Sequence, residues 1–322
     1  MTDASQPLDP SAPRVLPADV AGIAEAAQVL RSGGLVAVPT ETVYGLAARA
    51  DSDAAVAAIY RAKGRPDFNP LIVHVPDVET AARLAEFDDR ARKLADAFWP
   101  GALTLVLPRR ADAVLASAVT AGLPTVALRC PAHPAMRAVL ATSGLPLAAP
   151  SANRSGAVSP TTAAHVAASL GGRVDLILDG GACEAGIEST IVALRKDGTW
   201  QVLRPGPITE ARISGILGTS GGGVTSSGGI EAPGQLASHY APGKPVRLHA
   251  ETADVDEFHI GFGPVSGDVN LSATGDCAEA AARLYSALHQ GGASEKPRIA
   301  VAPIPDEGIG AAINDRLRRS AA

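Results

Sequence analysis

Two cations near a predicted helix end are the groups in this sequence best suited to bind phosphate. Lys63 and Arg65 flank a glycine, Pro66 follows them, and Asn69 lies three residues further on. A guanidinium binds a phosphate through two parallel hydrogen bonds, whereas an ammonium binds it as a point charge. Cations at a helix C-terminus also complement the helix dipole in solvent. The pattern therefore indicates either a phosphate clamp or a solvated helix cap.

A second polar segment follows an apolar strand and leads into a helix. It reads PSANRSGAVSPTT and contains Ser151, Asn153 and Ser159. Unpaired backbone N–H groups at such a strand-to-helix junction favour bound anions. Capping of the following helix would explain Ser159 or Thr161, but it does not explain the Ser-Ala-Asn segment. We therefore expect this segment to contribute to a binding site.

Other polar residues stand at the ends of predicted strands. They include the loop 39–45, which contains Thr42, and the residues Ser189 and Arg204. Loops at strand ends carry binding residues more often than other loops do. His74 lies inside the apolar strand 71–75, where a histidine is more often a satisfied core residue than a ligand contact. These residues are candidates for the same site, and His74 is the weakest of them.

The elements that would position these residues form two globular parts of a 322-residue chain. We expect a disordered tail over 1–14, an α/β domain with a mixed sheet over 15–217, a Gly/Ser-rich linker over 218–244 and a small α/β domain over 245–322. The periodicity predicts helices at 18–32, 52–63, 77–85, 88–98, 134–142, 161–170, 277–289 and 309–319. It predicts strands at 35–38, 71–75, 103–107, 125–129, 147–149, 176–178, 258–262 and 298–303, and a hairpin over 189–203.

Composition and missing motifs exclude several classes of protein. The net charge is −5, from 28 basic and 33 acidic residues, which argues against a protein that holds nucleic acid mainly by its phosphates. The sequence has no GxxxxGK[ST] loop, no GxGxxG loop after a strand, and no Cys/His cluster. No apolar run is long enough for a membrane span, and the start of the chain lacks signal-peptide features. We therefore expect a cytoplasmic protein without a protein-held metal.

Five strings occur in a fixed order and resemble one known family. VAVPTETVYGLAA, KGRPDFNPLIVHV, SANRSGAVSPTTAAHV, GIESTIV and LRPGPIT closely resemble the YrdC-like family of L-threonylcarbamoyladenylate synthases over residues 18–215. The part containing HYAPGKPVRL resembles the additional C-terminal domain of the two-domain members. The resemblance implies an open, twisted mixed sheet with helices around a basic cleft. It also implies a small Rossmann-like α/β domain after the linker.

The resemblance further implies an enzymatic activity. Such a nucleotidyltransferase makes threonylcarbamoyl-AMP and pyrophosphate from L-threonine, bicarbonate and ATP, for threonylcarbamoyladenosine modification of tRNA. Mg²⁺ would accompany ATP, with no organic cofactor. Downstream tRNA threonylcarbamoyl-transfer proteins would receive the product, and no stable direct binding of nucleic acid and no membrane contact are expected. The alternatives are a non-catalytic RNA- or nucleotide-binding paralogue, and a carbamoyl-transfer domain of the kind found in much longer hydrogenase-maturation proteins.

The resemblance also implies roles for individual residues. The threonine-binding positions are Thr42, His74, Arg129, Ser189 and the backbone of Ala149. The ATP-binding positions are Lys63, Arg65, Asn69, Thr125, Ser151, Asn153, Ser159, Arg204 and Tyr240. Lys63 and Arg65 would act in catalysis by stabilising charge as pyrophosphate leaves. Tyr240 would belong to a lid formed by the linker, with an exposed linker tyrosine as the alternative.

Overall fold

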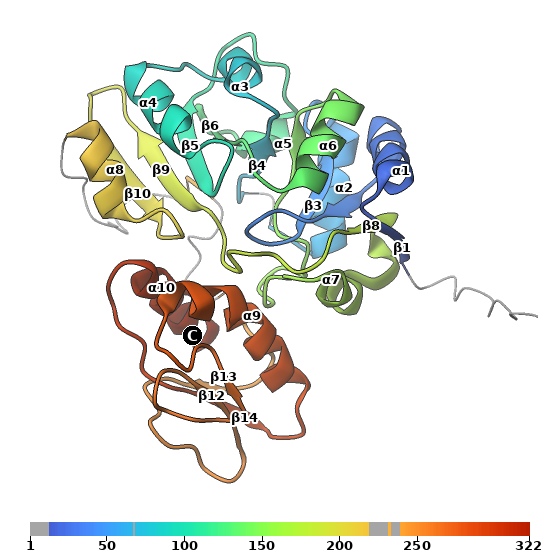
Figure 1. Cartoon of the computed structure of the whole chain (residues 1–322). Coiled ribbons are helices and arrows are strands. Elements are labelled where there is room, and N and C mark those ends of the chain that lie inside the picture. The colour runs from blue at the N-terminus through green and yellow to red at the C-terminus, as the bar shows by residue number, and fades with distance from the viewer. Residues whose placement is uncertain (1–12, 67, 219–230, 233–238) are drawn as a thin grey trace, which may run out of the picture.

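The computed structural model describes residues 13–66, 68–218, 231–232 and 239–322, and it contains a larger and a smaller α/β unit (Figure 1). Nearly all of the predicted tail over 1–14, and most of the predicted linker over 218–244, lie outside the described residues. The first described strand begins at Arg14, the last residue of the predicted tail.

The larger unit is built on a ten-stranded mixed sheet. Its strand order is β1-β8-β2-β3-β7-β4-β6-β5-β9-β10, with parallel pairs such as β4–β6 beside antiparallel pairs such as β2–β3. The strands are β1 (Arg14–Pro17), β2 (Val36–Val38), β3 (Gly45–Arg49), β4 (Ile72–His74), β5 (Leu103–Pro108), β6 (Thr125–Arg129), β7 (Leu147–Ala148), β8 (Leu176–Asp179), β9 (Thr190–Leu194) and β10 (Trp200–Arg204). The predicted mixed α/β architecture is confirmed.

Helices pack on this sheet, and most of them begin at side-chain caps. Ser52 accepts a hydrogen bond from the backbone of the first turn of α2, and Gly64 ends that helix in the left-handed conformation, where glycine is favoured. Thr162 caps α7 in the same way. The helices are α1 (Val20–Arg31), α2 (Asp53–Lys63), α3 (Val78–Leu84), α4 (Asp89–Phe98), α5 (Ser117–Thr120), α6 (Pro134–Ser143), α7 (Ala163–Leu170) and α8 (Glu210–Leu217).

Most elements of the larger unit occur where the periodicity predicts them, but β1, β3, α5 and α8 were not predicted. β3 follows directly from the polar loop 39–45, and its GLAAR sequence is short and rich in alanine, which has no strand preference. β1 has four residues and pairs with β8 at the edge of the sheet. Such short elements are stabilised by their partners in the folded sheet rather than by their own sequence.

The smaller unit has a parallel four-stranded sheet in the order β11-β14-β12-β13. Its strands are β11 (Val246–Arg247), β12 (Glu257–Gly261), β13 (Val269–Asn270) and β14 (Arg298–Val301), and its helices are α9 (Cys277–Ala293) and α10 (Ile309–Ser320). Both helices lie between this sheet and the larger unit (Figure 1). The parallel sheet agrees with the predicted Rossmann-like domain.

The two units share one hydrophobic cluster. Val43, Val158 and Ile187 of the larger unit are buried together with Leu284 and Tyr285 of α9. The contact is close in places. A Cβ atom on Gly186 would lie 2.4 Å from the Cα atom of Ala282 in α9. Because packed interiors deform little, this contact fixes the smaller unit against the segment 186–189 of the larger one.

The described helices include none that is both long and apolar enough to span a membrane.

Candidate functional site

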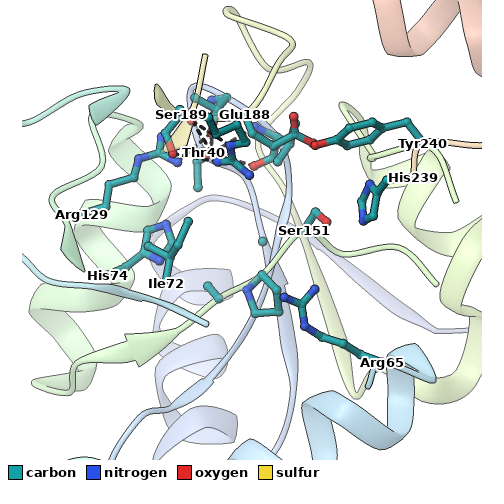
Figure 2. A pocket seen from close by; sticks show the side chains of 16 residues that line it. Thr40, Arg65, Ile72, His74, Arg129, Ser151, Glu188, Ser189, His239 and Tyr240 are labelled. Carbon is teal, nitrogen blue, oxygen red and sulfur yellow. Dashed lines mark hydrogen bonds between the residues drawn. The ribbon is translucent and has the colours of Figure 1, made fainter. Parts of the chain in front are cut away.

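A polar pocket lies where several strands of the larger sheet end (Figure 2). Nine of the residues predicted for the site line it, namely Thr42, Arg65, His74, Arg129, Ala149, Ser151, Ser189, Arg204 and Tyr240. The strand pairing explains part of this arrangement. His74 at the end of β4 is directly paired with Arg129 at the end of the neighbouring parallel strand β6. Residues up to 198 positions apart in the sequence, Thr42 and Tyr240, thus meet in one pocket.

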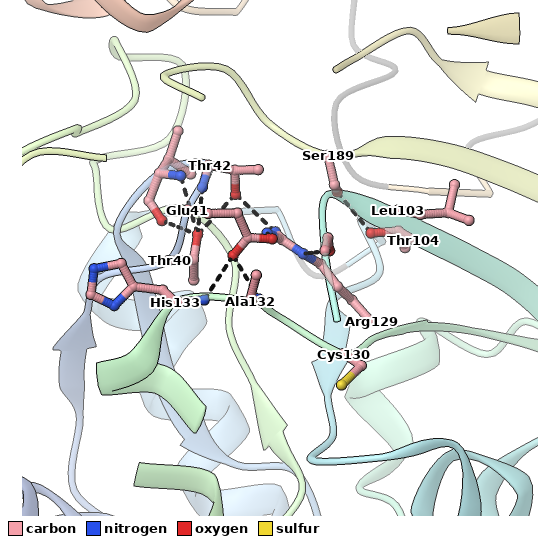
Figure 3. A network of polar contacts seen from close by, with 12 residues as sticks. Thr40, Glu41, Thr42, Leu103, Thr104, Arg129, Cys130, Ala132, His133 and Ser189 are labelled. Carbon is pink, nitrogen blue, oxygen red and sulfur yellow. Dashed lines mark hydrogen bonds and ion pairs between the residues drawn. The ribbon is translucent and has the colours of Figure 1, made fainter. Parts of the chain in front are cut away.

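The Arg129 guanidinium is held in place by the loop that follows β2 (Figure 3). Its Nη2 atom lies 2.6 Å from a carboxylate oxygen of Glu41, and its Nη1 atom donates to the Thr42 hydroxyl at 2.8 Å. The other carboxylate oxygen of Glu41 accepts the N–H group of Ala132 at 3.0 Å. Burial raises the pKa of Glu41, but the Arg129 charge and the hydrogen bonds from Arg129 and the backbone together outweigh burial, so the net pKa is lowered. This buried, oriented cation is suited to bind a carboxylate.

A second hydrogen-bonded group at the pocket contains the Ser189 hydroxyl and the Arg204 guanidinium. The Ser189 and Thr104 hydroxyl oxygens are 2.7 Å apart. Arg204 donates to the Ser189 carbonyl at 2.9 and 3.1 Å and to its hydroxyl at 3.1 Å. Both Ser189 and Arg204 are buried and line the pocket. Arg204 therefore fixes the position of Ser189 while it also contributes positive charge to the pocket.

Lys63 and Arg65 are buried, so the solvated-cap alternative is wrong. Their exposed fractions are 3% and 9%. The Lys63 Nζ atom donates to the carbonyl oxygens of Ser151 at 2.6 Å and Asn153 at 2.5 Å. Arg65 lines the pocket, and Lys63 does not. Lys63 thus connects the end of α2 to the predicted Ser-Ala-Asn segment, which a solvated lysine would not do.

Several polar atoms of this region have no protein partner although they are buried. These are Nδ1 of His74, Nδ1 of His239, Oδ1 of Asn69 and Oδ1 of Asn153. Burial, with a smaller contribution from the Arg129 charge, lowers the pKa of His74 to about 3, so this histidine is neutral near pH 7. The alternative of a satisfied core histidine is wrong, because His74 lines the pocket with an unpaired nitrogen. Unpaired buried polar atoms indicate a polar ligand.

The remaining predicted residues lie outside the pocket lining. Lys63 and Asn153 belong to the connection just described, and Asn69 accepts a hydrogen bond from Arg65 through its backbone. Ser159 donates to a carboxylate oxygen of Glu188 at 2.5 Å. Thr125 is the first residue of β6, whereas Arg129 is the last. The structure therefore brings nine of the predicted residues to the pocket wall and places the other five around it or beyond it.

The predicted set of site residues lacked four polar residues at the pocket. Thr40, Glu188 and His239 line it, and Glu41 orients Arg129 from behind. Glu41 and Glu188 each directly precede a predicted site residue, Thr42 and Ser189, and this adjacency is the sequence signal that could have identified them. Tyr240 is 1% exposed, so the alternative of an exposed linker tyrosine is wrong.

The described lining of the pocket is rich in positive charge and offers no protein cage for a metal. In this part of the chain, Arg65, Arg129 and Arg204 line the pocket together with the carboxylate of Glu188. Burial lowers the pKa of Arg65 only to about 10, so it remains charged near neutral pH. Within the described part of the chain, no group of three or more His, Cys, Asp and Glu residues is placed to hold a metal ion. The arrangement can bind one or two anionic groups side by side.

Comparison with known proteins identifies the family. A family model described as "Telomere recombination" matches residues 28–206, and one described as "Threonylcarbamoyl-AMP synthase, C-terminal domain" matches residues 208–322. The chain is 42% identical to the threonylcarbamoyl-AMP synthase of Bacillus subtilis, covering 93% of this chain and 92% of the relative. It is 38% identical to that of Pyrococcus abyssi, covering 92% of each.

A solved structure agrees with both family matches. The crystal structure of P. abyssi Sua5 complexed with L-threonine superposes with a TM-score of 0.86 at 34% identity, covering 96% of this chain and 97% of that one. Since the matches extend over both units and the relatives are covered almost completely, the chain belongs to the threonylcarbamoyl-AMP synthase family in its two-domain form.

Proposed function

We propose that this protein is an L-threonylcarbamoyl-AMP synthase, a nucleotidyltransferase that consumes L-threonine, bicarbonate and ATP. One observation carries the proposal. In a single pocket, Arg129 and its neighbours form one side that suits a carboxylate, and Arg65 and Arg204 form another that suits phosphates. An enzyme that joins an amino acid to a nucleotide needs these two sides next to each other. The family membership of the whole chain supports the same activity.

On the carboxylate side, Arg129 binds the α-carboxylate of threonine through two hydrogen bonds. Glu41 keeps the guanidinium plane in the required orientation. The neutral His74 contacts the substrate without repelling its amine. The Thr42 and Ser189 hydroxyls, together with the Ala149 backbone, line the rest of this side and supply groups that can hydrogen-bond the amine and the hydroxyl of threonine.

On the phosphate side, Arg65, Arg204 and Ser151 contact ATP, and Tyr240 forms part of the wall around it. Lys63 supports this side by holding the carbonyl groups of the Ser-Ala-Asn segment. Asn69, Thr125, Asn153 and Ser159 complete the proposed nucleotide-binding set. Mg²⁺ would accompany the ATP phosphates, would be held mainly by them, and would neutralise part of their charge. Among the described residues, no group of three or more His, Cys, Asp and Glu side chains is placed to hold it.

The reaction needs no covalent intermediate with the protein. The threonine amine captures bicarbonate as a carbamate with loss of water. A carbamate oxygen then forms a bond to the α-phosphorus, and the bond between that phosphorus and the β-phosphate oxygen breaks. Pyrophosphate leaves with the electron pair of that bond, and the guanidinium group of Arg65 stabilises its charge. Catalysis then consists mainly of positioning, charge stabilisation and exclusion of water.

The product carries an activated threonylcarbamoyl group, so a second protein must transfer that group to tRNA. We propose that this transfer is the work of downstream partner proteins and that this chain does not hold tRNA stably, in line with its net charge of −5.

Pyrophosphate release tests the proposed function. The assay contains ATP, Mg²⁺ and bicarbonate, with L-threonine, L-serine, glycine or no amino acid. We expect release that requires both bicarbonate and L-threonine. Arg129→Met removes the carboxylate partner and abolishes this release, whereas Arg83→Met, at an exposed residue of α3, leaves it unchanged. Binding of ATP without threonine-dependent release would instead indicate the non-catalytic paralogue.

A further inference from the structure

A buried carboxylate joins the smaller unit to the pocket. Glu188 is 6% exposed and lines the pocket one residue before Ser189. One of its carboxylate oxygens accepts a hydrogen bond from the Ser159 hydroxyl at 2.5 Å. The other accepts one from the Tyr285 hydroxyl at 2.7 Å and one from Nε of Arg316 at 3.1 Å. Tyr285 and Arg316 belong to α9 and α10, so the smaller unit supplies two of the three side-chain donors.

Besides the Glu188 carboxylate, Arg316 also contacts two backbone carbonyl groups next to pocket-lining residues. Its side chain is fully buried. It donates to the carbonyl oxygen of Pro205 at 2.6 Å and to that of Glu188 at 3.4 Å. Pro205 follows Arg204, and Glu188 precedes Ser189. One guanidinium of the smaller unit therefore holds the two backbone segments that carry Arg204 and Ser189 into the pocket.

The charges explain why this contact matters. A buried carboxylate is stable only when it is paired with opposite charge and hydrogen-bonded. Burial raises the pKa of Glu188, but the charges of Arg316 and Arg204, together with the hydrogen bonds from Ser159 and Tyr285, outweigh burial and lower it to about 2. If Arg316 is removed, Arg204 is the remaining large source of opposite charge for this carboxylate. Arg204 would then be drawn toward Glu188 and away from Ser189, which it now holds.

The same residues of the smaller unit also contact the aromatic part of the wall. The ring centroids of Tyr285 and Tyr240 are 5.4 Å apart. The guanidinium carbon of Arg316 lies 5.8 Å from the centroid of the Tyr240 ring, and that of Arg319 lies 5.0 Å from it. The smaller unit thus touches two residues that line the pocket, Glu188 and Tyr240, through one set of side chains.

We propose that Arg316 and Tyr285 are positioning residues of the active site, which they serve by holding Glu188 so that Ser159, Ser189 and Arg204 keep their binding positions. This gives the C-terminal domain a direct part in substrate binding. The proposal rests on the proposed function, because Ser189 and Arg204 are assigned there to threonine and ATP. Since these residues bind substrates rather than react, the effect of Arg316 falls on KM more than on kcat.

The test is a double-mutant cycle with Arg316→Met and Glu188→Gln. Methionine keeps much of the side-chain length and loses the charge, which leaves Glu188 a buried carboxylate without its main counter-charge. We expect Arg316→Met to raise KM for L-threonine and ATP roughly tenfold, with a much smaller change in kcat. Adding Glu188→Gln removes the uncompensated charge, so the double variant should return to within about threefold of the native KM values.

Two further variants serve as a control and as a milder change. Arg318→Met, at a 58% exposed side chain of the same helix, should leave both KM values unchanged. Tyr285→Phe keeps the ring and removes one donor to Glu188, so KM should rise about threefold even if Arg316→Met does not fold.

A purely structural role of Arg316 gives a different pattern. Loss of docking between the units would make the double variant at least as impaired as Arg316→Met, and that result would overturn the proposal, as would native KM values in Arg316→Met. The native chain is assayed in parallel, so an inactive native chain identifies a failure of the proposed function itself. In that case, calorimetric binding of L-threonine to the same variants tests the positioning role, with the same rescue expected.

Discussion

Replacing Lys63 with methionine should destabilise the protein even in the absence of ATP. The Nζ atom makes two short hydrogen bonds to the carbonyl oxygens of Ser151 and Asn153, and the side chain is buried. A hydrogen bond to a charged group contributes about 1.5–3 kcal/mol, so two bonds contribute about 3–6 kcal/mol. The cost of burying the ammonium group offsets part of this hydrogen-bond contribution. The same burial lowers the pKa of Lys63. We expect a net loss of about 3 kcal/mol in the free energy of unfolding.

Thermal unfolding without nucleotide measures this loss. For a unit of this size, about 3 kcal/mol corresponds to a decrease of roughly 6–12 °C in Tm. Lys93→Met, at an exposed lysine of α4, is the control and should leave Tm unchanged. KM for ATP should also rise in Lys63→Met, because the segment held by Lys63 forms part of the phosphate side. A native Tm combined with a raised KM for ATP would refute the structural connection and leave Lys63 as a phosphate ligand only.

Three further predictions concern the substrate pocket, its titration and the contact between the units. Glu41→Gln removes an ion pair of the pocket and should raise KM for L-threonine about fivefold in steady-state assays, with KM for ATP unchanged; an equal rise in both would contradict the assignment. Burial lowers the pKa of His74 and of His239 to about 3, so the unfolded chain takes up protons below pH 6.5 that the folded chain does not. Urea unfolding should therefore show stability falling from pH 6.5 toward pH 3, by about 1.4 kcal/mol per pH unit for each histidine, and equal stability at pH 7.5 and 5.5 would argue against neutral burial. Gly186→Ala places a Cβ against α9 and should lower the free energy of unfolding by about 2 kcal/mol more than Gly198→Ala, a glycine that also has positive φ but no neighbour within 4 Å; similar losses in both would mean that this contact is not tight.

Local sequence signals were sufficient for most of the fold and for much of the site. The apolar periodicity predicted helices such as α2 and α9, and the Asp197-Gly198 turn predicted the β9–β10 hairpin. The resemblance placed Thr42, Arg129 and Ser151 in one site, and the structure brings these residues to the same pocket. These predictions succeeded because each depends on a short stretch of sequence or on a motif of adjacent residues.

The features that were missed depend on residues that are distant in the sequence. Glu41 orients Arg129 across 88 positions, and Arg316 contacts Glu188 across 128. A carboxylate next to a predicted site residue does not reveal in the sequence which cation it pairs with. The phosphate clamp was predicted only from adjacent residues of the segment 63–66. It therefore did not reveal that Lys63 donates to backbone carbonyl groups of a segment about 90 residues away. Such contacts arise from packing, which periodicity does not record.

The most direct test of the central claim is the fate of the carbon atom of bicarbonate. The protein is incubated with ATP, Mg²⁺, L-threonine and ¹³C-bicarbonate, and the nucleotide products are analysed at once by mass spectrometry. The account predicts threonylcarbamoyl-AMP that carries one ¹³C atom, formed in amounts equal to the pyrophosphate released, and absent with Arg129→Met. Release of AMP and pyrophosphate with no labelled adduct, from a folded protein that binds both substrates, would contradict it.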